Sequence, residues 1–231
     1  MIKIENVEIY GWEAAIRGMR NPMNSWGKSD SCPAVNCEKC GRIEREGMCS
    51  VKGRDCTGFE CFYIGDEDLK LMKNLVRAGN DHGKFMRMIG VSLDIVAPLY
   101  WWKEFDTYKV GTVANSCSTM HKIAAKPFEI VDFSHENLQI PMLEVLKHTI
   151  HALNDARDAY LGSKDKLMWW QMIQLLPSSY NQRRTVMFNY AVLMNIYASR
   201  KNHKLDEWRD FCKWIEGLPY SELITGGKEN D

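Results

Sequence analysis

Apolar side chains recur every three or four residues through most of the second half of the chain, and this spacing is the feature that most restricts the fold. The period predicts amphipathic helices in four places: after Ser134, over 167–175, after Ser178 or Ser179, and over 205–215. In the third of these, Val186, Met187 and Tyr190 would share one buried helix face. This half of the chain is therefore predicted to be helical.

Strand-like alternation appears only in the first half of the chain. Ile2, Ile4, Val7 and Ile9 nearly alternate with polar residues, and Val91, Leu93, Ile95 and Ala97 do so again. Shorter helices are predicted over 12–21, 66–77 and 98–109. Strands early and helices late predict an α+β fold, with a sheet packed against long helices.

The charge balance of the 231 residues excludes some classes of partner. Thirty Lys and Arg offset thirty Asp and Glu, so no global field favours general nucleic-acid binding. The longest apolar stretch, 88–102, contains Asp94 and Pro98 and is too short to span a membrane. With no signal-peptide pattern at the start, a cytoplasmic protein is expected. Its length fits a single domain over 1–231.

Six of the eight cysteines lie between Cys32 and Cys61, in a segment without a sustained apolar period. This predicts a Cys-rich insertion at about 27–63. Four thiolates could close a structural zinc site, since one C-x-x-C pair is present. The candidate ligands are Cys37, Cys40, Cys49 and Cys56. Reduced thiols or a local disulfide are the alternatives.

A run of small and polar residues, VGTVANSCST at 110–119, is the first candidate for a ligand site. Gly111 permits close backbone approach, and hydroxyls flank Cys117 on both sides at Ser116 and Ser118. Cys117 is a candidate nucleophile toward a pyrimidine C6, although its thiolate would need a cation, and Lys109 is the one nearby in sequence. An ordinary polar loop is the alternative.

Three segments together resemble the flavin-dependent thymidylate synthases. The helix and turn at 71–87 resemble that family's histidine-containing turn, with His82 at the histidine and Ala97-Pro98 at the family's Ala-Pro pair. Residues 97–118 lie without a gap on the signature Arg-His-Arg followed after seven residues by Ser. In 176–200, the matching positions are Leu176, Pro177, Asn189, Leu193, Met194, Asn195 and Arg200.

The resemblance implies the family's fold, a homotetramer, FAD, and methylation of a pyrimidine nucleotide such as dUMP at C5. Methylenetetrahydrofolate would supply the carbon and NADPH the hydride. It implies that His82, Asn189 and Asn195 contact the flavin. It places Arg200 at the nucleotide, with a role in catalysis, and Glu104 at a family glutamine, where its carboxylate could accept from the pyrimidine N–H.

The signature is degenerate in this chain, which puts the reaction in doubt. Thr107-Tyr108-Lys109 stands where the family has Arg-His-Arg, and Cys117 stands at the serine. Lys109 offers a point charge where an arginine would offer a fork of donors. Arg183 and Arg184 are the candidate substitutes, with a solvated helix face as the alternative. The other functions that the residues allow are a non-catalytic nucleotide- or flavin-binding relative and a zinc-knuckle interaction protein.

Overall fold

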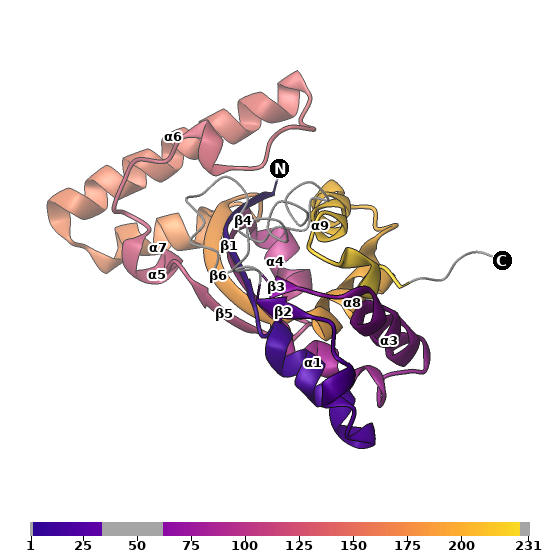
Figure 1. Cartoon of the computed structure of the whole chain (residues 1–231). Coiled ribbons are helices and arrows are strands. Elements are labelled where there is room, and N and C mark those ends of the chain that lie inside the picture. The colour runs from indigo at the N-terminus through magenta and orange to yellow at the C-terminus, as the bar shows by residue number, and fades with distance from the viewer. Residues whose placement is uncertain (1, 34–61, 227–231) are drawn as a thin grey trace. The chain divides into compact units, whose positions relative to one another are not determined.

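The computed structural model describes residues 2–33 and 62–226 and has an α+β fold (Figure 1). Its antiparallel sheet has the strand order β1-β4-β6-β5. The bounds of these strands are Lys3–Tyr10, Gly90–Pro98, Asn181–Asn189 and Val113–Ser116. A separate two-stranded sheet pairs β2, Cys32–Pro33, with β3, Phe62–Tyr63. None of the helices in the described ranges is long and apolar enough to cross a bilayer.

The chain divides into two compact units, which are described one at a time. Unit 1 comprises Met1–Ile4, Ile95–Thr107 and Ala114–Thr185. Unit 2 comprises Glu5–Asp94, Tyr108–Val113 and Val186–Asp231. The boundary crosses the four-stranded sheet, so each of its strands contributes residues to both units.

The α-helices among the described residues of unit 2 are α1, Trp12–Arg20; α3, Asp66–Arg77; α8, Tyr190–Arg200; and α9, Asp206–Glu216. Short 3-10 helices lie at Asn21–Met23, Trp26–Lys28, Gly83–Met88 and Ser221–Leu223. The ring of Trp12 meets those of Tyr190 and Tyr220 edge-on at 5.1 and 5.3 Å between centroids. Both tyrosine hydroxyls are satisfied, since Tyr190 donates to Pro219 O and Tyr220 accepts from Ile64 N. These interactions tie α1, α8 and the chain's last described turn into one core.

A buried ion pair joins α1 to α3 in the same unit. Arg20 Nε donates to Asp68 Oδ1 at 2.7 Å, and the hydroxyls of Ser29 and Ser31 each donate to Asp68 Oδ2 at 2.6 Å. Burial alone would raise the pKa of Asp68, but these hydrogen bonds outweigh it and hold the pKa below its ordinary value. The segment just before β2 is therefore integral to the core of unit 2.

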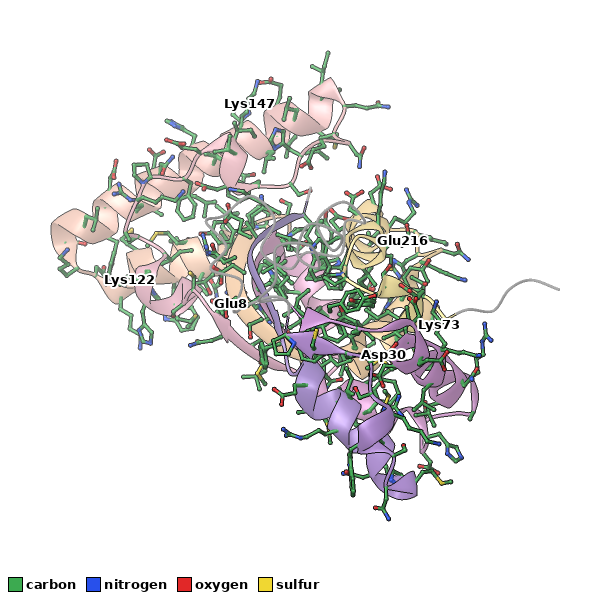
Figure 2. All side chains as sticks on the ribbon, in the orientation of Figure 1. Glu8, Asp30, Lys73, Lys122, Lys147 and Glu216 are labelled. Atoms are coloured by element: carbon green, nitrogen blue, oxygen red, sulfur yellow. The ribbon has the colours of Figure 1, made fainter. Side chains whose placement is uncertain are left out.

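Asp30, labelled in Figure 2, caps the start of α3. Its carboxylate accepts from the backbone amides of Glu67 and Asp68, at 3.0 and 3.1 Å. A Cβ at Gly65 would lie 2.1 Å from Asp30 Cγ, so only glycine admits this close approach. The composition predicts that residues 29–33 belong to the Cys-rich insertion. In the structure, however, Ser29, Asp30 and Ser31 hydrogen-bond to α3 in the core of unit 2.

Unit 1 contains α4, Leu99–Phe105; α5, Thr119–Lys122; the 3-10 turn Ile130–Asp132; α6, Ile140–Ser163; and α7, Lys166–Leu175. Helix α7 runs back beside α6 (Figure 1), and the two share a core. The fully or nearly buried residues of that core are Ile123, Phe128, Phe133, Leu146, Ile150, Leu153 and Met172.

The predicted elements β1, α1, α3, β4, α7 and α9 are confirmed, but three of the expected helices differ. The predicted third helix is wrong at its start, because 181–189 is strand β6 and the helix begins only at Tyr190. Gln182, Val186 and Phe188 are buried at even positions, which is a period of two. The long helix begins at Ile140, with Pro141 in its first turn, and not after Ser134. The helix after Pro98 ends at Phe105, before the predicted 109.

Candidate functional site

The residues that the sequence predicts for the site belong to both units, and each group is described within its own unit. Unit 2 holds His82, Lys109, Asn189, Asn195 and Arg200. Unit 1 holds Glu104, Ser116, Cys117 and Ser118.

Arg200, the last residue of α8, lies on an aromatic platform formed by Tyr108 and Trp208. Its Nε donates to Tyr108 Oη at 2.9 Å. Its guanidinium carbon lies 4.8 Å from the ring centre of Trp208 and 5.6 Å from that of Tyr108. Trp208 is fully buried on α9, so the platform is anchored in the core. Stacking and the hydrogen bond together hold a permanent positive charge in a fixed place.

The platform residues are functional candidates that the sequence analysis missed. Tyr108 entered it only as the middle of the degenerate triplet, and Trp208 only as one of several apolar residues on a predicted helix. The sequence does contain a signal for Tyr108, because Tyr108 stands at the histidine position of the family signature that the chain resembles. The stacking of Arg200 on Trp208 depends on the packing of α8 against α9, which apolar spacing alone does not specify.

Asn189 lies at the junction of β6 and α8 and caps the helix. Its Oδ1 accepts from Val192 N at 3.1 Å, so half of the carboxamide has a structural role. Gly111, at φ +77°, approaches the other half. A Cβ there would lie 3.3 Å from Asn189 Nδ2 and 3.1 Å from Val192 Cγ2. The loop at 108–113 thus packs closely on the start of α8, and both belong to unit 2.

The other predicted residues of unit 2 are exposed. Asn195 lies mid-way along α8 on its exposed face. His82 precedes the 3-10 turn Gly83–Met88, and Lys109 follows Tyr108; both side chains are exposed. These three side chains therefore do not belong to the core of the described residues.

Arg184 is held inside unit 1 and is not a solvated helix residue. Its Nη1 donates to Asp106 at 2.6 Å, its Nε donates to Gln182 Oε1 at 2.9 Å, and its guanidinium carbon lies 4.2 Å from the ring centre of Trp102. Gln182 Nε2 in turn donates to Cys117 O at 3.0 Å. This network joins α4, β6 and the end of β5 and pairs Arg184 with Asp106, whose side chain is half exposed.

The predicted polar run in unit 1 has mixed roles. Cys117 N donates to Arg183 O at 2.9 Å, while the Cys117 thiol is exposed. Ser118 caps the four-residue helix α5 by accepting from His121 N, and Ser116 is an exposed end of β5. Glu104 is partly buried on α4. Ser116 and Cys117 thus present side chains to solvent from a backbone fixed to β6.

The tryptophan pairs divide between core and surface. Trp101 and Trp102 are fully buried, and Trp102 Nε1 donates to Gln182 O at 2.9 Å, so this pair belongs to the core. Trp169 and Trp170 form an edge-on pair on α7, and Trp170 is 39% exposed.

The predicted zinc ligands Cys37, Cys40, Cys49 and Cys56 lie outside the described residues, so zinc binding there stays a prediction. Within 2–33 and 62–226, no group of three or more His, Cys, Asp or Glu side chains could hold a metal ion.

Comparisons with known proteins identify the fold. No protein-family model matches the chain, and no curated protein matches its sequence. Among solved structures, thymidylate synthase X (ThyX) of Helicobacter pylori with FAD and dUMP aligns over 98% of both chains, with a TM-score of 0.64 and 16% identity. A second complex of that enzyme with FAD and dUMP covers 96% of this chain and 98% of the other, with a TM-score of 0.61 and 16% identity.

A third solved structure extends the similarity beyond that enzyme. The UMP/dUMP methylase PolB of Streptomyces cacaoi, bound with 5-Br dUMP, aligns over 97% of this chain and 95% of its own, with a TM-score of 0.54 and 15% identity. At these identities the likeness concerns the fold, and it spans nearly the whole of each chain. The chain therefore has a fold similar to that of flavin-dependent thymidylate synthase ThyX.

Proposed function

We propose that this chain binds FAD and a pyrimidine nucleotide. The observation that carries the proposal is Arg200. Sequence order places it at the nucleotide-contacting arginine of the resembled family, and the structure holds its guanidinium on Trp208 and Tyr108. The solved structures with FAD and dUMP, or with 5-Br dUMP, have a fold similar to that of this chain. Zinc, tetrameric assembly and a cytoplasmic location remain predictions from the sequence.

The residues fit such ligands in their chemistry. Arg200 supplies a permanent cation for a phosphate or a pyrimidine carbonyl. The exposed carboxamide of Asn195 and the imidazole of His82 can bond the polar edge of a flavin. In unit 1, Glu104 can accept from a pyrimidine N–H, and Ser116 and Ser118 carry hydroxyls that can donate to phosphate oxygens. In unit 2, Lys109 carries a cation that can offset part of a phosphate charge.

Binding is tested by titrating FAD and dUMP separately into the purified chain and into Arg200→Ala. We expect the substitution to weaken dUMP binding roughly ten- to hundred-fold, because a charge-assisted hydrogen bond contributes about 1.5–3 kcal/mol. Lys201→Ala, which removes the exposed neighbouring cation, should leave the affinity unchanged. Equal dUMP affinities in Arg200→Ala and the unmodified chain would contradict the assignment of Arg200.

For the reaction, we propose weak or absent methylation of free dUMP. When bound, reduced FAD would supply the hydride chemistry, so the protein's own residues mainly bind and orient. The phosphate of dUMP carries about two negative charges. Thr107 and Tyr108 stand where the family signature has an arginine and a histidine, and Arg184, a candidate substitute, is paired with Asp106. This pairing favours a second candidate function, a non-catalytic nucleotide- or flavin-binding relative.

Tritium release from C5-labelled dUMP, with FAD, NADPH and methylenetetrahydrofolate present, separates the two candidates. A methyltransferase releases tritium as the C5–H bond is replaced, and a binding protein does not. Turnover of about 1 s⁻¹ or faster, an ordinary enzymatic rate, would contradict the expectation of weak methylation.

A further inference from the structure

The hydroxyl of Thr112 is buried in unit 2 and has no hydrogen bond to any of the described residues. Thr112 lies between Gly111 and the start of β5, in the loop that packs on the start of α8. Most buried hydroxyls in proteins are hydrogen-bonded, because burial removes their bonds to water. A buried hydroxyl that the described fold does not satisfy therefore points to a partner from outside the fold.

The loop around Thr112 also exposes apolar surface. The side chains of Val110 and Val113 are 91% and 60% exposed, although both are apolar. Gly111 turns the chain at φ +77°, and a Cβ there would lie only 3.1 Å from Val192 Cγ2. The backbone of the loop is therefore close to α8, while the two valines on either side of Thr112 remain accessible.

The groups of α8 and its cap that approach Gly111 are uncharged, and this restricts the kind of partner. They are the carboxamide of Asn189 and a methyl group of Val192. A phosphate buried beside them would lose its hydration without gaining a cation, whereas a neutral ring with a polar edge loses much less. Flavin and pyrimidine rings both have an imide edge, a C=O beside an N–H, and one hydroxyl can donate to the first or accept from the second. Their flat faces can cover the exposed valines.

We propose that the hydroxyl of Thr112 hydrogen-bonds to the imide edge of a bound ring. The inference rests on the proposed function and adds Thr112 to the residues assigned to it above. A ring reaches the hydroxyl through a displacement of the turn at Val110 and Gly111, whose residues are exposed. Because the fold has already removed this hydroxyl from water, its bond to the ring replaces no bond to water. The bond therefore contributes more to affinity than one made by an exposed hydroxyl.

Thr112→Val tests this, because it removes the hydroxyl and keeps the shape of the side chain. Stability and affinity should then change in opposite directions. Without ligand, the melting temperature should rise by about 2–4 °C, since the variant no longer buries an unsatisfied group. FAD and dUMP are titrated separately by calorimetry, and the ligand whose ring is bound should lose affinity about five- to hundredfold. The other ligand should bind as before, so the two titrations identify the ring.

Two further variants serve as controls. Thr112→Ser keeps the hydroxyl and should bind both ligands nearly as the unmodified chain does. Thr149→Val makes the same change on α6, where the hydroxyl already donates to Val145 O at 2.9 Å, and should alter neither affinity.

Unchanged affinities for both ligands in Thr112→Val would overturn the inference, whatever its melting temperature. An equal loss of affinity in Thr112→Ser would also overturn it, because the hydroxyl would then not be the cause. An unmodified chain that binds neither FAD nor dUMP would instead contradict the proposed function, and the role of Thr112 would fall with it.

Discussion

At the scale of single residues, Asp68 is a buried charge that holds several parts of unit 2 together. It accepts from Arg20, Ser29 and Ser31 in a site with no solvent access, so an amide in its place would lose a charge and at least one acceptor. Removing one partner of a buried pair leaves the other charge uncompensated. Asp68→Asn is therefore expected to lower the free energy of unfolding by about 3–5 kcal/mol at pH 7. Urea unfolding measures this, with the exposed Asp210→Asn as control.

The pKa of Asp68 also predicts the pH dependence of stability. Because its hydrogen bonds hold the folded-state pKa below the unfolded value, near 3.9, the carboxylate stabilises the fold above that value. The stabilisation is lost as the pH falls through the lower folded-state pKa. Between about pH 5 and pH 2, stability should therefore fall more steeply in the unmodified chain than in Asp68→Asn. Parallel pH profiles for the two chains would contradict this assignment.

The aromatic platform gives a second prediction for single residues. Tyr108→Phe keeps the ring beside Arg200 and removes only the hydroxyl that accepts from Nε. We expect dUMP affinity to fall about two- to ten-fold, since such a bond contributes about 0.5–1.5 kcal/mol. Tyr10→Phe, on β1 of the same unit, should bind as the unmodified chain does. Calorimetry compares them, and an unaltered affinity in Tyr108→Phe would show that the hydroxyl does not position Arg200.

At the scale of elements, substitutions of Asn189 can separate its role as the cap of α8 from a role in binding flavin. Asn189→Ala removes the cap of α8 and should cost about 1 kcal/mol of stability. Asn189→Asp retains a capping oxygen but replaces Nδ2, the donor that faces Gly111. If the carboxamide contacts flavin, Asn189→Asp unfolds like the unmodified chain yet takes up less FAD. Equal FAD uptake by Asn189→Asp and the unmodified chain would show that Asn189 acts only as the cap of α8.

The pairing of β2 with β3 determines which residues of the Cys-rich segment can be removed. Residues 34–61 run between strands whose ends pair at Pro33 and Phe62, a separation that a two-residue Gly-containing turn can close. Replacing 34–61 by such a turn retains Ser29, Asp30 and Ser31 and their bonds to α3, and it should remove any zinc. Replacing 29–61 should unfold unit 2, because Ser29, Asp30 and Ser31 bond to α3. Equal stability of the two deletions would contradict the role given to 29–33.

A helix or strand was predictable from the sequence where the spacing of its apolar residues matches the positions that are buried in the structure. The alternation at Val91 and Leu93 matches buried positions of β4, and α3 has the predicted bounds of 66–77. Strand β6 was missed because Val186, Met187 and Tyr190 also fit a helical stripe, whereas the buried Phe188 fits only a period of two. The start of α6 was misplaced because Ser134 hydrogen-bonds Glu136 and Tyr100 and caps no helix.

At the scale of the whole molecule, the order of degenerate motifs proved more informative than any one of them. Individually, Thr107-Tyr108-Lys109 or Asn195 is a weak signal, yet their order and spacing predicted the fold that the comparisons then showed. The network of Arg184 with Asp106 and the platform under Arg200 were not predictable, since both join side chains from distant parts of the sequence.

The central claim is that this fold binds a flavin, and the visible absorption spectrum of the purified chain tests it most directly. We expect flavin absorbance, and mass spectrometry of the molecule released on denaturation should identify it as FAD. Chain purified without cofactor should take up FAD with a dissociation constant below about 0.1 mM, or about −5.5 kcal/mol. A colourless protein that takes up no FAD at that concentration, while remaining folded by circular dichroism, would contradict the claim.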